Sequence, residues 1–469
     1  MTSVAPFPWP HRPGKRLTAL ITAVALLAAG GPASAQPPAK GPPIIRDAEI
    51  EQLLREYTQP LLQAAGLAKQ NIQVVIINDR AFNAFVADGR RIFINAGTLM
   101  DANTPNEVIG VLAHETGHIA GGHLSRLREE VGKATTQSIV ALLLGAGALV
   151  AASRSGSANM GQAGMAALQA PQAMIQSSLL AYVRTQEDAA DRAGVKFLTA
   201  TGQSAKGMHD SFKRLADQIL YQTRYIDPYM QSHPLPAERV RALAELARSS
   251  PHWDKKDSAA LQQRHDLMRA KLYGFMDRPD AVLRRFQAGD TSLPARYARA
   301  IASYRFANST GAIGQIDALI QSNPQNPYFH ELKGQALLEG GKPAEAVAPL
   351  RHAAQLAPNP SLIQIMLAQA LIASNARGEE AVTLLEQALR REPESPEAHA
   401  QLAMAYGRKG DLAHADLSSA QAAFMRGELQ TARQLAARAK TRFPVGSPGW
   451  VKADDIATYR APGQAGQRN

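Results

Sequence analysis

Hydrophobic and polar positions divide the first third of the chain into helical and extended segments. Between residues 44 and 67, apolar side chains recur at helical spacing, with Pro60 as an interruption. The apolar runs 72–77 and 91–95 have instead the length and the β-branched content of strands. We therefore expect a small sheet directly ahead of residues 106–122, the most informative stretch of the chain.

Residues 106–122 have the pattern of a buried helix. A capping box begins at Thr104, and Pro105 stands at the first helical position. Because residues four apart lie on the same side of a helix, His114 and His118 face one way. This spacing predicts that the two imidazoles hold one metal ion. A capped helix with two surface histidines is the alternative.

The segment from His114 to His118 reads His-Glu-Thr-Gly-His, the H-E-x-x-H pattern of zinc peptidases. Glu115 lies beside the two histidines without being a ligand, which suits a general base acting on the water that a zinc ion activates. The chain has no cysteine, so any further zinc ligand must be a histidine or a carboxylate. We expect one zinc ion per chain.

A second helix, predicted to begin at residue 182, offers the third ligand. Glu187 and Asp191 share one face with Ala190 and Gly194, whose small size permits close contact with the histidine helix. We expect Glu187 to bind the metal and Asp191 to accept the second ring N–H of a metal-bound histidine. A solvated acidic helix face is the alternative.

Two more histidines are candidates for the site. His123 lies about 140° around a continuing helix from His118, so it is a minor candidate for the third ligand and better placed to support the site. His233 is held between a loop and Pro234, and Arg239 follows six residues on. We expect His233 to cap the open position of the metal or to help stabilise an oxyanion, with Arg239 supporting the site. A turn at a helix start is the alternative.

Zinc peptidases commonly hold substrate as a strand added to a sheet edge beside the metal. We expect that edge to consist of Ile92, Phe93, Ile94 and Asn95. Farther along, residues 133–184 carry one charged side chain between their ends, and 138–152 is a solid apolar run. A buried helix with a flexible loop, a membrane-inserting segment and an active-site lid compete here. The run is short for spanning a bilayer, so we favour a lid with a buried helix.

The N-terminus has the features of a secretory signal. A basic start and an apolar run precede Ala33-Ser34-Ala35, which predicts cleavage after Ala35 and export. The formal charge of +11 is spread along the chain, without a basic block that contains aromatic residues. Nucleic-acid binding is therefore not expected. Peripheral contact with an anionic membrane surface stays open.

From about Leu293 the chain repeats itself. Pro324, Pro358 and Pro393 lie 34 and 35 residues apart, the period of tetratricopeptide repeats, and Gly334 falls where such repeats need close helix contact. We expect an all-α solenoid whose concave groove binds a protein partner. The expected boundaries are 1–35 for the signal peptide, 36–250 for the metalloprotease domain, 251–292 for a helical connector, 293–445 for the repeats and 446–469 for a flexible tail.

Four separated motifs together resemble one family of zinc peptidases. They are His114–His118, Glu187–Asp191, His233-Pro234 with Arg239, and Asn83-Ala84-Phe85 ahead of a glycine and a strand. These motifs are similar to those of the gluzincin peptidases that include CAAX-prenyl endopeptidases and heat-shock membrane proteases. The resemblance covers about residues 44–249. It implies a mainly α chain with an α+β zincin-type domain, zinc on His114, His118 and Glu187, and Glu115 as the base.

The membrane helices typical of this family are not evident, and a signal peptide with helical repeats resembles its periplasmic branch instead. There, the histidine that matches His233 is a further zinc ligand that holds the site shut. The resemblance implies a latent periplasmic zinc endopeptidase, with misassembled outer-membrane β-barrel proteins as clients and the barrel-assembly machinery as partner. The alternative is a repeat chaperone or adaptor with a vestigial or structural metal site. Glu115 argues against it, because a structural site needs no base.

Overall fold

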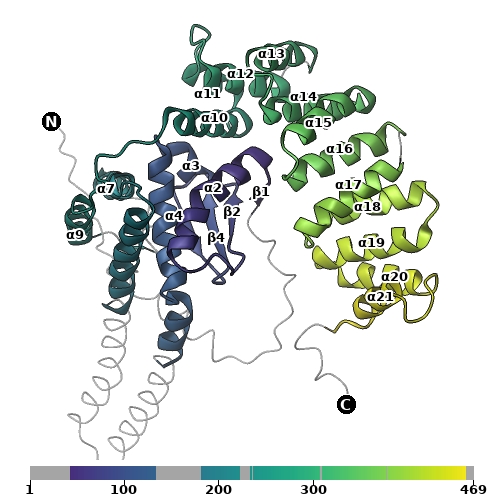
Figure 1. Cartoon of the computed structure of the whole chain (residues 1–469), viewed down its shortest axis with the longest axis horizontal. Helices are drawn as coiled ribbons and strands as arrows, with labels where there is room; N and C mark the ends of the chain where they lie inside the picture. Colours follow the sequence, from purple (N-terminus) through teal and green to yellow (C-terminus); the bar gives the residue numbers. More distant parts are fainter. Residues whose placement is uncertain are drawn as a thin grey trace, which may run out of the picture. The chain divides into compact units, whose positions relative to one another are not determined.

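The computed structural model describes residues 43–133, 181–221, 233–234, 236–306, 309–375 and 378–460. From Ile44 onward these residues belong to one compact unit (Figure 1). The predicted signal peptide and nearly all of the predicted lid, residues 134–180, lie outside the described residues. No helix of the described part is long and apolar enough to cross a membrane.

A small sheet begins the predicted metalloprotease domain. Its strands are β1 (Ile44–Ile45), β2 (Gln73–Ile77), β3 (Ala84–Val86) and β4 (Arg91–Asn95), in the order β1-β2-β4-β3. The two strands expected from the apolar runs, β2 and β4, pair in parallel, and β1 and β3 flank them as antiparallel partners. β1 and β3 were not expected, because two or three residues are too few to show an alternating pattern.

The prediction that Ile92–Asn95 forms the substrate edge is wrong. β4 lies inside the sheet, where it pairs with β2 on one side and β3 on the other. Its backbone groups are therefore engaged by two neighbours and cannot accept an added strand. Among the described strands, the edge strand that contacts the histidine helix is β3.

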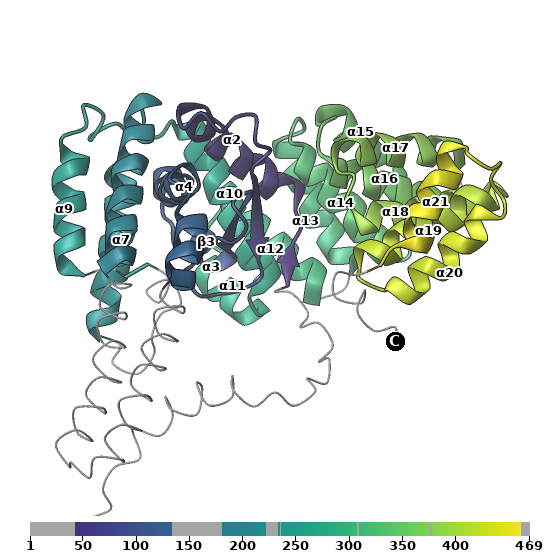
Figure 2. The same ribbon diagram turned by 90° about the horizontal axis from the view of Figure 1, so that it is seen from below.

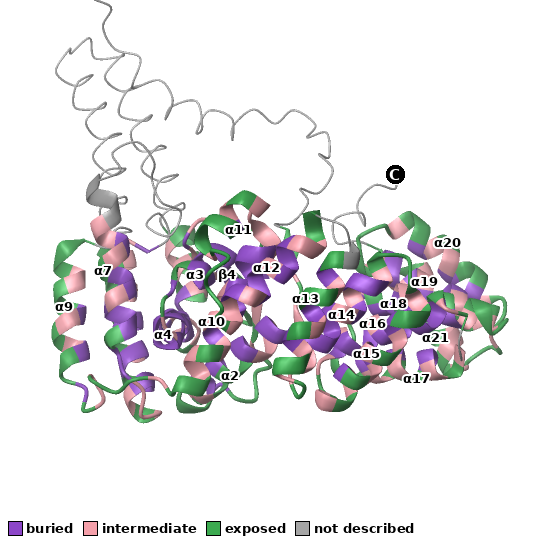
Figure 3. Cartoon of the chain, turned by 90° about the horizontal axis from the view of Figure 1, so that it is seen from above, coloured by how far each residue is buried: buried purple, intermediate pink, exposed green. Residues whose placement is uncertain are grey.

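The helix that carries the two histidines, α4 (Pro105–Ala120), runs through the centre of the domain. The Thr104 side chain accepts a hydrogen bond from the Glu107 N–H, as the capping box predicted. Every residue of α4 up to Gly117 is buried (Figure 3). It packs against α2 (Ala48–Ala64), which continues through Pro60. The short α3 (Ala96–Asp101) follows β4 and contacts it.

Glycines at the contact let helix 181–200 approach α4 closely. A Cβ atom at Gly117 would lie 2.7 Å from the Ala190 carbonyl oxygen, and one at Gly194 would lie 3.2 Å from the His114 nitrogen. The small face predicted on helix 181–200 thus contacts α4. Next to it, α7 (Lys206–Tyr221) packs on α4, and α9 (Ala237–Arg248) packs on α7 (Figure 2).

The predicted connector is helical and contributes side chains to two hydrophobic cores. It consists of α10 (Ala259–Met276) and α11 (Pro279–Arg285). Met268 and Leu272 of α10 belong to the core that surrounds α4, whereas Leu267 and Ala270 join the first repeat helices. Because its opposite faces are both apolar, α10 joins the domain that contains α4 to the repeats.

The repeats are stacked helical hairpins in which consecutive helices pack on one another. They are α12 (Leu293–Phe306) with α13 (Ser309–Ser322), α14 (Pro327–Glu339) with α15 (Pro343–Leu356), α16 (Ser361–Ala373) with α17 (Gly378–Arg391), α18 (Pro396–Arg408) with α19 (Leu412–Met425), and α20 (Leu429–Lys440) with α21 (Pro448–Thr458). A Cβ atom at Gly334 would overlap the Leu350 side chain of the same hairpin, so this position needs a glycine.

The prediction of a flexible tail over 446–469 is wrong for most of its length. Helix α21 begins at a proline after Ser447, whose side chain caps the Trp450 N–H. Ala453 and Ile456 are buried against the preceding helices. A Ser-Pro start followed by apolar residues at helical spacing predicts a helix. Pro444, a few residues earlier, marks the end of the last repeat and favours a loop instead.

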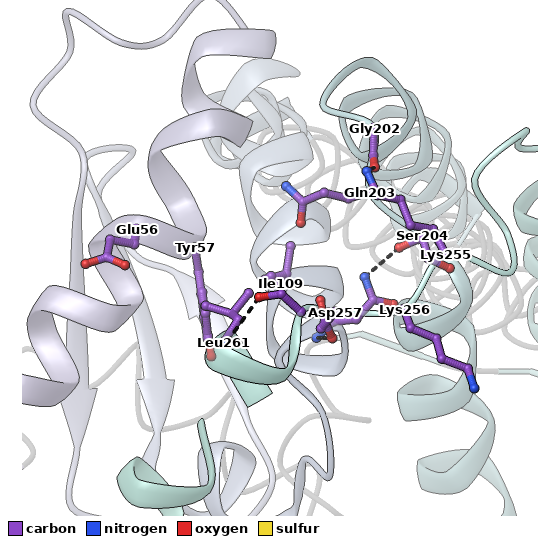
Figure 4. A pocket seen from close by; sticks show the side chains of 12 residues that line it. Glu56, Tyr57, Ile109, Gly202, Gln203, Ser204, Lys255, Lys256, Asp257 and Leu261 are labelled. Carbon is purple, nitrogen blue, oxygen red and sulfur yellow. Dashed lines mark hydrogen bonds between the residues drawn. The ribbon is translucent and has the colours of Figure 1, made fainter. Parts of the chain in front are cut away.

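A cavity of about 300 Å³ lies at the N-terminal end of α4. Tyr57, Ile109 and Leu261 form its apolar wall, and Asp257 accepts a hydrogen bond from the Asn106 N–H at its polar side (Figure 4). His114 and His118 are in the C-terminal half of α4 and do not line this cavity. The cavity is therefore separate from the candidate site.

Candidate metal centre

Four side chains from three parts of the domain converge beside α4. They are His114 and His118 of α4, Glu187 of helix 181–200, and His233 from the segment ahead of α9, and their ligand atoms lie within 4.8 Å of one another. The Nε2 atoms of His114 and His118 are 3.0 Å apart, and each lies 3.4 Å from a Glu187 oxygen. His233 Nδ1 lies 3.4 Å from His114 Nε2 and 3.0 Å from Glu187 Oε2.

These separations fit a metal ion held by all four groups. Ligands about 2.0–2.1 Å from a tetrahedral zinc ion are about 3.3 Å from one another, close to the observed spacing. Two buried imidazole nitrogens that face each other need a shared proton or a shared metal. The donor set of nitrogen and carboxylate oxygen, without sulfur, is one that zinc accepts. The cluster is thus able to bind a metal.

Asp191 and Arg239 fix the orientation of these groups through hydrogen bonds and ion pairs. Asp191 Oδ1 lies 2.9 Å from His114 Nδ1, the ring nitrogen that faces away from the cluster. Arg239 donates two hydrogen bonds to the Asp191 carboxylate, at 2.7 and 2.8 Å, and its Nη1 lies 2.8 Å from Glu187 Oε2. Nη1 also donates to the Pro234 carbonyl at 3.0 Å. One guanidinium thereby connects Glu187, Asp191 and the segment that carries His233.

In the metal-free chain, interactions with oppositely charged groups outweigh the effect of burial on the pKa values of these residues. Burial by itself raises the pKa of Glu187, but hydrogen bonds to His114 and His233 outweigh it and hold the pKa well below its usual range. Burial likewise lowers the pKa of His114, but Asp191 and Glu187 outweigh it and raise the pKa to about 9. The pKa of Asp191 is lowered, because hydrogen bonds to Arg239 and His114 exceed its cost of burial. Glu187 and Asp191 therefore stay ionised.

Glu115 is fully buried next to the cluster. Neither of its carboxylate oxygens has a hydrogen-bond partner among the residues that the structure describes, and Oε1 lies 3.7 Å from His233 Nε2. Burial raises the pKa of this carboxyl group. An unsatisfied buried carboxyl group is costly, which makes Glu115 a candidate for a chemical role at the cluster.

His123 is not a member of the cluster. Its Nδ1 lies 3.0 Å from His118 Nδ1, the nitrogen on the far side of that ring from His114 and Glu187. Phe212 of α7 is a contact that sequence reasoning missed. Its ring meets that of His114 edge to face at 5.2 Å, and the Arg239 guanidinium lies 5.6 Å from the ring centre. One phenylalanine in an amphipathic helix gives no sequence signal of such a role.

Comparisons with known proteins agree with this site. The profile of peptidase family M48 matches residues 46–247, and tetratricopeptide-repeat profiles match 297–359 and 337–403. The β-barrel assembly-enhancing protease of Yersinia pestis is 25% identical over 86% of this chain and 82% of that protein. The one from Escherichia coli is 25% identical over 73% and 69%, respectively.

A relative from Vibrio cholerae is 28% identical over 61% of this chain, and the match spans only 58% of that protein's length. The family profile covers β2, β3, β4, α4, helix 181–200 and the His233 segment, so it includes every member of the cluster. Residues 46–247 therefore match the metallopeptidases of family M48, and the C-terminal part of the chain matches tetratricopeptide repeats.

Proposed function

We propose that the chain is a zinc-dependent endopeptidase in which His114, His118 and Glu187 hold the metal and Glu115 is the general base. The observation that carries this proposal is the pairing of a convergent ligand set with a buried carboxylate that has no hydrogen-bond partner among the described residues. Glu115 and two of the ligands, His114 and His118, come from neighbouring positions of one helix, α4. A metal site that only stabilises a fold has no use for an unpaired buried carboxylate.

When bound, zinc would polarise the scissile carbonyl and make the attacking water more acidic. The residues of the chain supply the remaining steps. Glu115 takes a proton from the attacking water at a carboxylate oxygen and later delivers it to the leaving amine. Asp191 keeps the hydrogen of His114 on Nδ1, so that its Nε2 lone pair points at the cluster.

Substrate binding is assigned to β3 in place of β4. β3 is an edge strand of the described sheet and contacts α4, so an extended polypeptide can pair with it beside the metal ligands. Main-chain pairing of this kind selects unfolded or extended segments over folded ones. This preference suits the degradation of misassembled proteins.

We further propose that the enzyme acts in the periplasm on stalled or misfolded outer-membrane β-barrel proteins. The support is the similarity to the Yersinia and Escherichia β-barrel assembly-enhancing proteases, together with the secretory features of residues 1–35. The tetratricopeptide repeats, a class of domain that binds proteins, would recruit clients or the barrel-assembly machinery.

The test is the cleavage of an unfolded β-barrel protein by Glu115→Gln and wild-type chains that both retain zinc. We expect Glu115→Gln to lower the cleavage rate by at least about 100-fold, because general-base catalysis typically supplies a factor of this order. Glu107→Gln is the matched control, since it makes the same change in the buried part of the same helix. Unchanged cleavage by Glu115→Gln would refute the peptidase proposal and favour a chaperone or adaptor.

A further inference from the structure

The chain turns sharply where α4 ends, and the turn brings one more histidine back toward the metal ligands. Gly122 has a φ of +63°, a left-handed conformation that favours glycine. A Cβ atom at Gly121 would overlap the His123 ring, so this ring occupies the space that a side chain would fill. The two consecutive glycines thus permit the placement of His123.

His123 contacts the outward face of His118. The two Nδ1 atoms are 3.0 Å apart, and the rings meet edge to face at 86° with their centres 5.0 Å apart. His123 is 7% exposed, so its ring is fixed by its surroundings instead of moving in solvent. His118 directs its other nitrogen, Nε2, at His114 and Glu187.

The position of one hydrogen follows from this geometry. An imidazole that binds a metal through Nε2 carries its hydrogen on Nδ1. The Nδ1–H of His118 then points at His123 Nδ1, which accepts it if the His123 hydrogen is on Nε2. We propose that His123 is a positioning residue of the metal site, whose Nδ1 accepts the His118 Nδ1–H and fixes the ring with Nε2 toward the metal. This inference rests on the proposed function, in which His118 is a ligand.

The two histidine ligands are thus held by different acceptors. Asp191 holds His114 from helix 181–200, whereas His123 holds His118 from the segment directly after α4, beyond the glycine turn. A ligand held by the segment that follows its own helix keeps its orientation when helix 181–200 shifts. Loss of the acceptor would leave the His118 N–H unpaired and the ring free to rotate, which typically weakens metal binding about 10- to 100-fold.

The test compares zinc affinity in the full chain, measured by competition with a chromogenic chelator. His123→Leu removes the acceptor and should raise the dissociation constant about 10- to 100-fold. His123→Asn keeps an oxygen near the Nδ1 position and should stay close to wild type. His209→Leu is the matched control, because His209 is similarly buried at 9% exposed and lies outside the cluster. The visible spectrum of the cobalt-substituted chain should change in His123→Leu alone.

Two results would overturn the inference while leaving the proposed function intact. One is wild-type zinc affinity in His123→Leu. The other is equal weakening in His123→Leu and His123→Asn, with a loss of thermal stability in the metal-free chain that matches the zinc effect. Failure of the wild-type chain to bind one zinc ion, or zinc binding unaffected by His114→Ala, contradicts the proposed function and this inference together.

Discussion

At the scale of single residues, the site combines groups that local spacing reveals with groups that it hides. His114, Glu115 and His118 are readable because one helix fixes their relation. Glu187 and Asp191 are readable as a pair, but only the fold shows that Arg239 bonds to both. Contacts between residues about 50 positions apart leave no periodic trace in one sequence. The roles of these residues remain proposals.

The His233 side chain lies among the proposed ligands and next to the proposed base, where it would compete with the attacking water and the scissile carbonyl. Its Nδ1 is among the ligand atoms, and its Nε2 lies 3.7 Å from the proposed base. We therefore predict that His233→Ala raises the basal rate of client cleavage or self-cleavage severalfold, in a peptidase assay at matched zinc content. If cleavage instead disappears while zinc stays bound, His233 is catalytic and does not hold the site shut.

At the scale of elements, the sequence located helices and repeats better than strands. The helices of the repeats followed from proline and small-residue spacing, and Gly334 lies in the predicted close contact. β1 and β3 are too short to be read from a pattern, and the position of β4 inside the sheet depends on them. A strand order cannot be obtained from strands that the pattern does not show.

The closeness of helix 181–200 to α4 should control metal binding. A side chain at Gly194 would push against the backbone of Ala113 and His114, and this would move Glu187 away from the two histidines. We predict that Gly194→Val costs about 1–3 kcal/mol of stability and weakens zinc binding at least about tenfold. Chemical denaturation and zinc titration measure the two effects.

Gly314→Val in α13 is the control for this prediction, because nothing lies within 4 Å of a Cβ atom at Gly314. It should change the stability by less than about 1 kcal/mol and leave zinc binding unchanged. Equal zinc affinity in Gly194→Val and wild-type chains would show that the helix crossing does not position Glu187.

At the scale of the whole molecule, the sequence did not show which parts of the chain α10 packs against. The sequence predicted only a helical connector over residues 251–292, whereas in the fold α10 contributes to both cores. Buried polar contacts accompany this packing. Lys271 Nζ lies 2.7 Å from Asp47 and 3.2 Å from Glu49, both at the start of α2, and Glu49 accepts a hydrogen bond from Tyr297 of α12.

His265 makes the attachment of α10 sensitive to acid. The ring is buried between the Tyr57 hydroxyl, 3.3 Å from Nδ1, and the Ala102 carbonyl, 2.9 Å from Nε2. Burial lowers the pKa of His265 to about 4 from the usual 6.5. Since the folded pKa is below the unfolded pKa, the stability from neutral His265 is fully present above about pH 6.5 and is lost as the pH falls toward 4.

We predict that the free energy of unfolding of the wild type falls by about 2 kcal/mol more between pH 7 and pH 5 than that of His265→Gln, an order-of-magnitude figure from 1.36 kcal/mol per pKa unit. The glutamine can still donate to Ala102 but does not titrate. Urea denaturation of the metal-free chains at both pH values gives the comparison. Parallel changes in the two chains would show that His265 does not ionise on unfolding in this range.

The central claim is that one zinc ion is bound beside α4 by His114, His118 and Glu187. The most direct measurement is anomalous X-ray scattering from crystals of the zinc-loaded chain, with data collected above and below the zinc absorption edge. We predict one peak about 2.0–2.1 Å from the Nε2 atoms of His114 and His118 and from a Glu187 oxygen. The absence of a peak there, or a single peak elsewhere in the chain, would contradict it.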